Sequence, residues 1–170
     1  MTLIGAPLEN YAQQHSDSVV MSIGDDETEF LFTAQDKATR IVIPVGYQLV
    51  AKRFFTQEPP TADELEYAIN YIEDEIMKVA ANIPHLGVEW VTNLAFVRSF
   101  AMQCFVKEAE TLVLNRVDLE RLFGEYAEII TGRPPRSYEP DISPVFYAQL
   151  LIFREYFHHL KFERITIISK

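Results

Sequence analysis

The stretch that most constrains the fold is residues 18–33, where two short apolar runs flank an acidic turn. The first run covers residues 19–23 and the second covers residues 30–32. Between them, Gly24-Asp25-Asp26 has the residue types that favour tight turns. The stretch therefore predicts a β-hairpin. Because both strands are largely apolar, the rest of the chain must cover them.

The tip of this hairpin carries four carboxylates: Asp25, Asp26, Glu27 and Glu29. Turn positions favour Asp for backbone reasons, which gives a solvated turn. Clustered carboxylates are also the ligands that hard divalent cations accept, and Asp25, Asp26 and Glu29 are then the candidate metal ligands. Spacing alone favours the solvated turn.

The composition is that of one globular domain. The chain has 170 residues, of which 48% are hydrophobic, and a formal net charge of −10. Such a charge opposes nucleic-acid binding, which depends on basic side chains. There is no apolar run long enough for a membrane span and no signal-peptide pattern. The lone Cys104 indicates a reduced, cytoplasmic location.

The remaining pattern predicts strands and helices in the order β-β-β-α-α-β-α-α-α-β. Residues 1–17 are polar and aperiodic, and are expected to form an arm or an edge strand. Residues 18–170 then make a single α/β domain, a mixed sheet of about five strands with helices packed on it. Strands are expected at 19–23, 30–32, 39–45, 88–91 and 164–168, and helices at 47–55, 61–83, 94–109, 115–131 and 144–160.

Several helix ends have recognisable signals. Thr61 and Glu64 form a capping box, and Ser143 precedes Pro144 at the next helix start. Asn93 and Asn115 are expected to cap the helices that come after them. His158 and His159 are expected to interact with the carbonyls at a helix end rather than with a metal, and His85 to lie in a loop. The helix at 144–160 is apolar nearly all round, which suggests burial on several sides and a homodimer.

Four local stretches, in this order, resemble the second lobe of the exopolyphosphatase/guanosine pentaphosphate phosphohydrolase (Ppx/GppA) family. Residues 22–29 match the family's D-I-G-G-G-S-T-E phosphate loop, and residues 43–46 match its S-L-P-x-G. The Pro-Pro break with the helix after it, and the closing helices and strand at 117–122 and 150–168, are also similar. The resemblance covers residues 18–169 and implies an actin-like, ribonuclease-H-like fold.

The resemblance identifies residues 22–29 as a degenerate phosphate loop. Gly24, Thr28 and Glu29 are kept, but Ser22 replaces the leading aspartate, Asp25 and Asp26 replace two glycines, and Glu27 replaces the serine. Phosphate loops need glycine because backbone N–H groups must approach the anion closely. Carboxylates at these positions repel phosphate unless a metal intervenes.

A second glycine-rich loop of the family, G-T-G-G-T-A, aligns with residues 92–97 and has lost its glycines. The degenerate positions are Thr92, Asn93, Ala95 and Phe96, whereas Arg98, just after the loop, matches the family. The family's first lobe, which carries the general base, has no counterpart in this sequence. The resemblance therefore implies a lobe that keeps the family's core and loses its catalytic site.

Three functions remain open at this point. The first is a non-catalytic lobe, without cofactor, that acts in interaction or regulation as a homodimer or with a cytoplasmic protein. The alternative is a phosphohydrolase of polyphosphate or guanosine pentaphosphate, with Mg²⁺ or Mn²⁺ held by the acidic turn. A ribonuclease-H-like nuclease is the third, disfavoured by Ser22 and by the net charge of −10.

Overall fold

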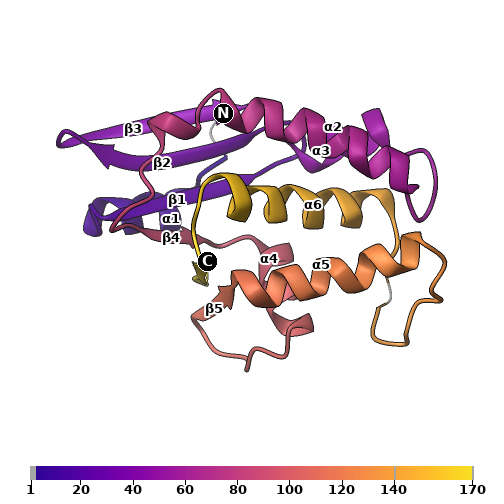
Figure 1. The fold of residues 1–170 in the computed structure, drawn as a ribbon. Coiled ribbons are helices and arrows are strands. Elements are labelled where there is room, and N and C mark those ends of the chain that lie inside the picture. The colour runs from indigo at the N-terminus through magenta and orange to yellow at the C-terminus, as the bar shows by residue number, and fades with distance from the viewer. Residues whose placement is uncertain (1–2, 140, 170) are drawn as a thin grey trace.

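One six-stranded mixed sheet organises the chain (Figure 1). The computed structural model describes residues 3–139 and 141–169. The elements in order are α1 (Ala6–Gln14), β1 (Ser18–Ile23), β2 (Thr28–Ala34), β3 (Lys37–Ile43), α2 (Tyr47–Phe54), α3 (Ala62–Met77), the 3₁₀ turn η1 (Ala80–Asn82), β4 (Glu89–Thr92), α4 (Ala95–Gln103), β5 (Leu112–Asn115), α5 (Arg116–Ile130), α6 (Pro144–His159) and β6 (Arg164–Ile167).

The strand order is β3-β2-β1-β4-β6-β5. The predicted hairpin is confirmed: β1, β2 and β3 form an antiparallel meander in which Ser22 pairs with Glu29. Strand β1 also pairs in parallel with β4, and β4 with β6. The carboxyl ends of β1 and β4 therefore lie at one edge of the sheet. The predicted α/β class and mixed sheet are confirmed, with six strands instead of about five.

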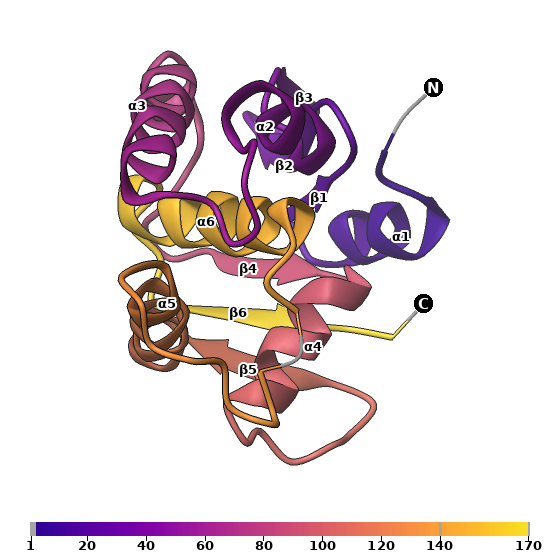
Figure 2. The same ribbon diagram turned by 90° about the vertical axis from the view of Figure 1, so that its right-hand side faces the viewer.

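Helix α6 is the centre of the main core. Ten of its residues are buried, and it packs against α2, α3 and α5 on one face of the sheet (Figure 2). Burial on several sides was expected from its apolar sequence. Because the lobe itself covers this helix, α6 leaves no apolar surplus for a second copy, and this reason for expecting a dimer is removed.

The opposite face of the sheet is covered by α1, which lies beside β1 and packs on β1 and β2 (Figure 2). Leu8 and Ala12, one helical turn apart, pack against Val20, Leu31 and Val91. The prediction of an arm or edge strand for residues 1–17 was wrong over this helix. Pro7 lies in its first turn, where proline is tolerated, so it does not break the helix.

The region after β4 differs from the prediction. Helix α4 ends at Gln103 instead of reaching 109, and the unpredicted strand β5 pairs antiparallel with β6. Leu112 and Leu114 point inward and Val113 outward, but four residues give too short an alternation to identify. None of the described helices combines the length and apolar character needed to cross a bilayer.

The predicted helix caps agree only partly with the structure. The capping box is present, with the Glu64 amide donating to Thr61 Oγ1 at 3.2 Å, and Ser143 Oγ accepts from the Phe146 amide. Asn93 is not the N-cap of α4, which is Leu94. Asn115 holds the N-cap position of α5 but makes no side-chain bond there.

Candidate functional site

Two loops meet at the carboxyl edge of β1 and β4. We call residues 22–29 loop 1 and residues 92–98 loop 2. Thr92 Oγ1 donates to the Met21 carbonyl at 2.9 Å, which ties loop 2 to the end of β1. The rings of Tyr47 and Phe96, at the starts of α2 and α4, are in edge contact with centroids 5.7 Å apart. The two stretches singled out in the sequence are therefore neighbours in space.

The backbone of loop 1 is fastened to the start of α2. The Gly24 amide donates to the Glu27 carbonyl at 2.8 Å and closes the turn. The carbonyls of Gly24 and Asp25 accept hydrogen bonds of 2.9–3.1 Å from the first three amides of α2. Amides at a helix start are the groups that would otherwise bind an anion. Here carbonyl oxygens of the loop already occupy them.

Two glycines allow this close packing. A Cβ on Gly46 would lie 2.4 Å from the carbonyl carbon and oxygen of Asp25, so only glycine fits against the turn. A Cβ on Gly24 would lie 2.7 Å from Leu3 Cδ2. The segment before α1 therefore rests on loop 1, a contact that no pattern in the sequence indicates.

The acidic side chains of loop 1 diverge. Asp25 and Asp26 are exposed at the turn, whereas Glu29 is buried on the α1 side of β2. Glu29 accepts from the amides of Leu3, at 2.8 Å, and Ile4, at 3.3 Å, and pairs with Arg40. The predicted metal candidates Asp25, Asp26 and Glu29 are thus not brought together, because strand β2 carries Glu29 away from the turn.

Loop 1 is electrostatically negative. None of Asp25, Asp26 and Glu27 forms an ion pair with a basic residue in the described part of the chain. Burial, followed by the Asp25 carboxylate, raises the pKa of Tyr47. A phosphate at this position would meet carboxylates without a compensating cation.

Thr28 has a structural role. Its hydroxyl donates to the Val45 carbonyl and accepts from Tyr156 Oη, both at 2.6 Å. Complete burial raises the pKa of Tyr156, so this phenol remains protonated. The position joins β2 to α6 inside the core and does not face a ligand.

Loop 2 offers little to an anion. Thr92 is buried, Ala95 is exposed, and Phe96 packs on Tyr47. Arg98 donates to Glu108 at 2.7 Å and to the carbonyls of Ala109 and Glu110 at 2.9 and 2.8 Å. It therefore holds the segment between α4 and β5 in place.

Other reactive groups lie outside the loops. Cys104 Sγ contacts the Asp118 carbonyl at 3.5 Å, and burial raises the pKa of this thiol to about 11, so it is mostly protonated at neutral pH. His158 and His159 face carboxylates of Glu120 and Glu155, at 2.5 and 3.3 Å, instead of the helix carbonyls that were expected. His85 lies in a loop, as predicted.

The sheet order, the helix layers and the paired loops define an actin-like α/β lobe. Solved structures of Ppx/GppA proteins share this fold. The Aquifex aeolicus PPX-GPPA enzyme matches 94% of this chain with a TM-score of 0.70 and 18% identity. An exopolyphosphatase from Cytophaga hutchinsonii matches 92% of it with a TM-score of 0.70 and 15% identity. An exopolyphosphatase-like protein matches 92% with a TM-score of 0.67 and 12% identity.

The chain spans about half the length of these structures: 55% of the Aquifex chain and 54% of the Cytophaga chain. No protein-family model and no curated protein matches the sequence. The expected fold, one actin-like lobe of the Ppx/GppA type, is confirmed. At these identities the likeness concerns the fold, and activity has to be argued from the loops.

Proposed function

We propose that this chain is a non-catalytic Ppx/GppA-like lobe, without a cofactor, that acts by binding a second copy of itself in the cytoplasm. The main support for the absence of catalysis is the arrangement of loop 1. Its carbonyls occupy the first amides of α2, and Asp25, Asp26 and Glu27 have no basic partner among the described residues.

The repulsion between the loop 1 carboxylates and a bound phosphate would be large compared with ordinary binding contacts. Two like charges 4 Å apart repel by about 4 kcal/mol at the effective dielectric typical of a protein surface. Each carboxylate beside a bound phosphate adds a repulsion of this kind. A loop built from glycine provides N–H donors and no such repulsion. The charges of loop 1 therefore argue against phosphate as its ligand.

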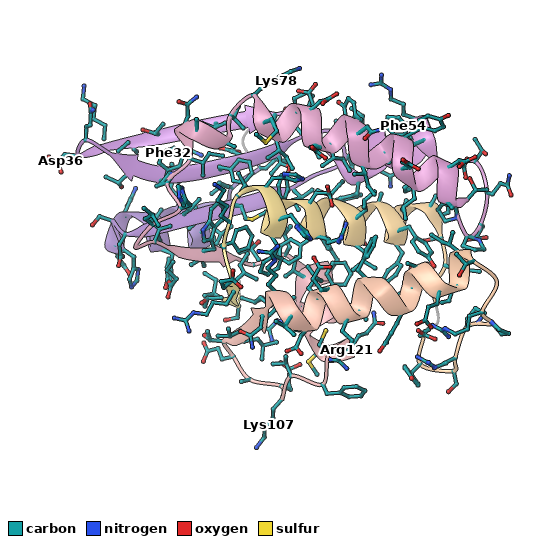
Figure 3. The ribbon with its side chains drawn as sticks, viewed as in Figure 1. Phe32, Asp36, Phe54, Lys78, Lys107 and Arg121 are labelled. Atoms are coloured by element: carbon teal, nitrogen blue, oxygen red, sulfur yellow. The ribbon has the colours of Figure 1, made fainter. Side chains whose placement is uncertain are left out.

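The binding half of the proposal rests on an apolar corner formed by α4, β5 and α5. Phe105 is 78% exposed and Val117 is 76% exposed. Their sequence neighbours Cys104 and Asp118 are in contact, so both belong to one region of the surface. In Figure 3, Lys107 projects from the segment between α4 and β5, and Arg121 lies on α5, both on the lower side of the view. Strand β5 also has a free outer edge, which is a ready site for pairing with another chain.

Light scattering on the purified protein tests this proposal. We expect a mass of twice the 19.6 kDa chain, and a shift toward the monomer in Phe105→Ser. Leu86→Ser is the matched control, because Leu86 is 81% exposed but lies in the loop before β4. A monomer at every concentration, or a dimer unaffected by Phe105→Ser, would contradict the proposed interaction surface.

A further inference from the structure

Helix α6 contains one deeply buried carboxylate. The Glu155 side chain is only 3% exposed in a helix that is otherwise largely apolar. Its Oε2 accepts from Arg154 Nη1 at 3.0 Å. Arg154 is itself fixed, with its guanidinium 4.5 Å from the centre of the Phe123 ring and its Nε 3.3 Å from Glu120 Oε2. This arrangement leaves the other oxygen of Glu155, Oε1, in a defined orientation.

Two further atoms that could ligate a metal ion lie close to Glu155 Oε1. His159 Nε2, one helical turn along α6, lies 3.3 Å away. Glu73 Oε2, from the neighbouring helix α3, lies 3.8 Å from the same imidazole nitrogen. All three atoms fall within 4.8 Å of one another, and theirs is the one such set found among the described residues.

These three atoms approach without forming hydrogen bonds. His159 Nε2 has an ion-pair contact with Glu155 Oε1 and another with Glu73 Oε2, and within residues 3–139 and 141–169 no hydrogen bond joins these three atoms. Glu155 Oε1 therefore belongs to a side chain that is only 3% exposed, and it faces the imidazole of His159. Two carboxylates and an imidazole gathered this closely form a set of ligand atoms that a metal cation would stabilise.

We propose that Glu73, Glu155 and His159 bind one divalent transition-metal ion of the Zn²⁺ type. Ligand bonds of about 2.0–2.2 Å in a tetrahedral site place neighbouring ligand atoms ~3.3 Å apart. His159 Nε2 already lies 3.3 Å from Glu155 Oε1, and Glu73 Oε2, 3.8 Å from the same nitrogen, would move slightly inward. Two carboxylates balance the charge of the ion, and the imidazole favours zinc, cobalt or iron over magnesium. Arg154 acts from outside the site, by holding the ligand carboxylate in place.

Three protein ligands leave a coordination position open. His159 also lines a cavity of about 250 Å³ between η1 and the end of α6, together with His85 and Met77. The cavity has room for a water molecule or a small ligand on the metal. The site lies in the helix layer between α3 and α6 and is built from residues that neither loop 1 nor loop 2 contains.

Metal titration of tag-free protein tests the proposal. We expect one equivalent of Co²⁺ to bind with a visible absorption band, and Zn²⁺ to displace it. His159→Gln and Glu73→Gln should each weaken the affinity by at least about tenfold. His158→Gln is the matched control, because this adjacent imidazole faces Glu120 instead, and it should leave the affinity unchanged. Thermal unfolding of each apo variant checks that it is folded.

Two results would overturn the proposal. One is the absence of saturable Co²⁺ or Zn²⁺ binding to folded wild-type protein. The other is binding that His159→Gln and His158→Gln change equally. Either result would leave the cluster as contacts of His159 with Glu73 and Glu155 that hold helices α3 and α6 together.

Discussion

Glu139 is a buried carboxylate whose protonation should destabilise this lobe. Its side chain is buried and accepts two hydrogen bonds from Arg133, at 2.9 and 2.7 Å, and one from the Arg136 amide at 2.8 Å. The Arg133 guanidinium holds the pKa of Glu139 below its ordinary value of 4.5. The unfolded chain therefore binds this proton more readily, so the contribution to stability is fully present above pH 4.5 and is lost as the pH falls from there through the lower pKa of the folded state.

Glu139→Gln should make the free energy of unfolding lower at pH 7 and less dependent on pH in this acidic window. Urea denaturation at a series of pH values measures both effects. Glu163→Gln is the control, since Glu163 is exposed and lies 3.6 Å from its partner Arg116. An unchanged pH dependence in Glu139→Gln would contradict the assignment.

For single residues of loop 1, the sequence predicted the turn but not the direction of every side chain. The turn at Gly24-Asp25-Asp26 follows from local chemistry and was predicted. The orientation of Glu29 was not, because its partners Arg40 and the amides of Leu3 and Ile4 are set by tertiary packing. His159 is a similar case, since its neighbour Glu73 lies on another helix.

At the level of helices and strands, the close packing of loop 1 against the start of α2 leads to a specific stability prediction. Gly46→Ala places a Cβ 2.4 Å from backbone atoms of Asp25 and Asp26, which cannot move aside as a flexible side chain can. We expect a loss of stability of about 1–3 kcal/mol, the usual cost of overpacking. Urea denaturation measures it.

Gly124→Ala is the control for that substitution. Gly124 lies within α5, and a Cβ there meets nothing within 4 Å. Removing a helical glycine should raise stability by roughly 0.5–1 kcal/mol. Equal stability of the two variants would show that the turn does not press on Gly46.

Some helices and strands had sequence signals strong enough to predict them, and others did not. The long apolar period and the Thr61–Glu64 box predicted α3, and the Ser143-Pro144 start predicted α6. Helix α1 was missed because only Leu8 and Ala12 of its residues are buried, too few to show a period. Strand β5 was missed because it has four residues of its own and its pairing partner, β6, comes only after α5 and α6 in the sequence.

The whole molecule shares the fold of the Ppx/GppA structures, whereas loops 1 and 2 are the basis of the proposed loss of catalysis. The layers around α6 form one continuous core of buried side chains, and α1 completes the other face of the sheet. The chain reproduces this architecture over 55% of the length of the Aquifex structure. A lobe can retain such a core under selection for folding alone, whereas phosphate chemistry requires specific groups at the loops.

Phosphate release from polyphosphate and from guanosine pentaphosphate, measured with Mg²⁺ and separately with Mn²⁺, tests the proposed loss of catalysis most directly. We predict no release above the buffer blank, because loop 1 presents carboxylates where N–H donors are needed. The contradicting result is release that scales with protein concentration, saturates with substrate and disappears in the double variant Asp25→Asn, Asp26→Asn.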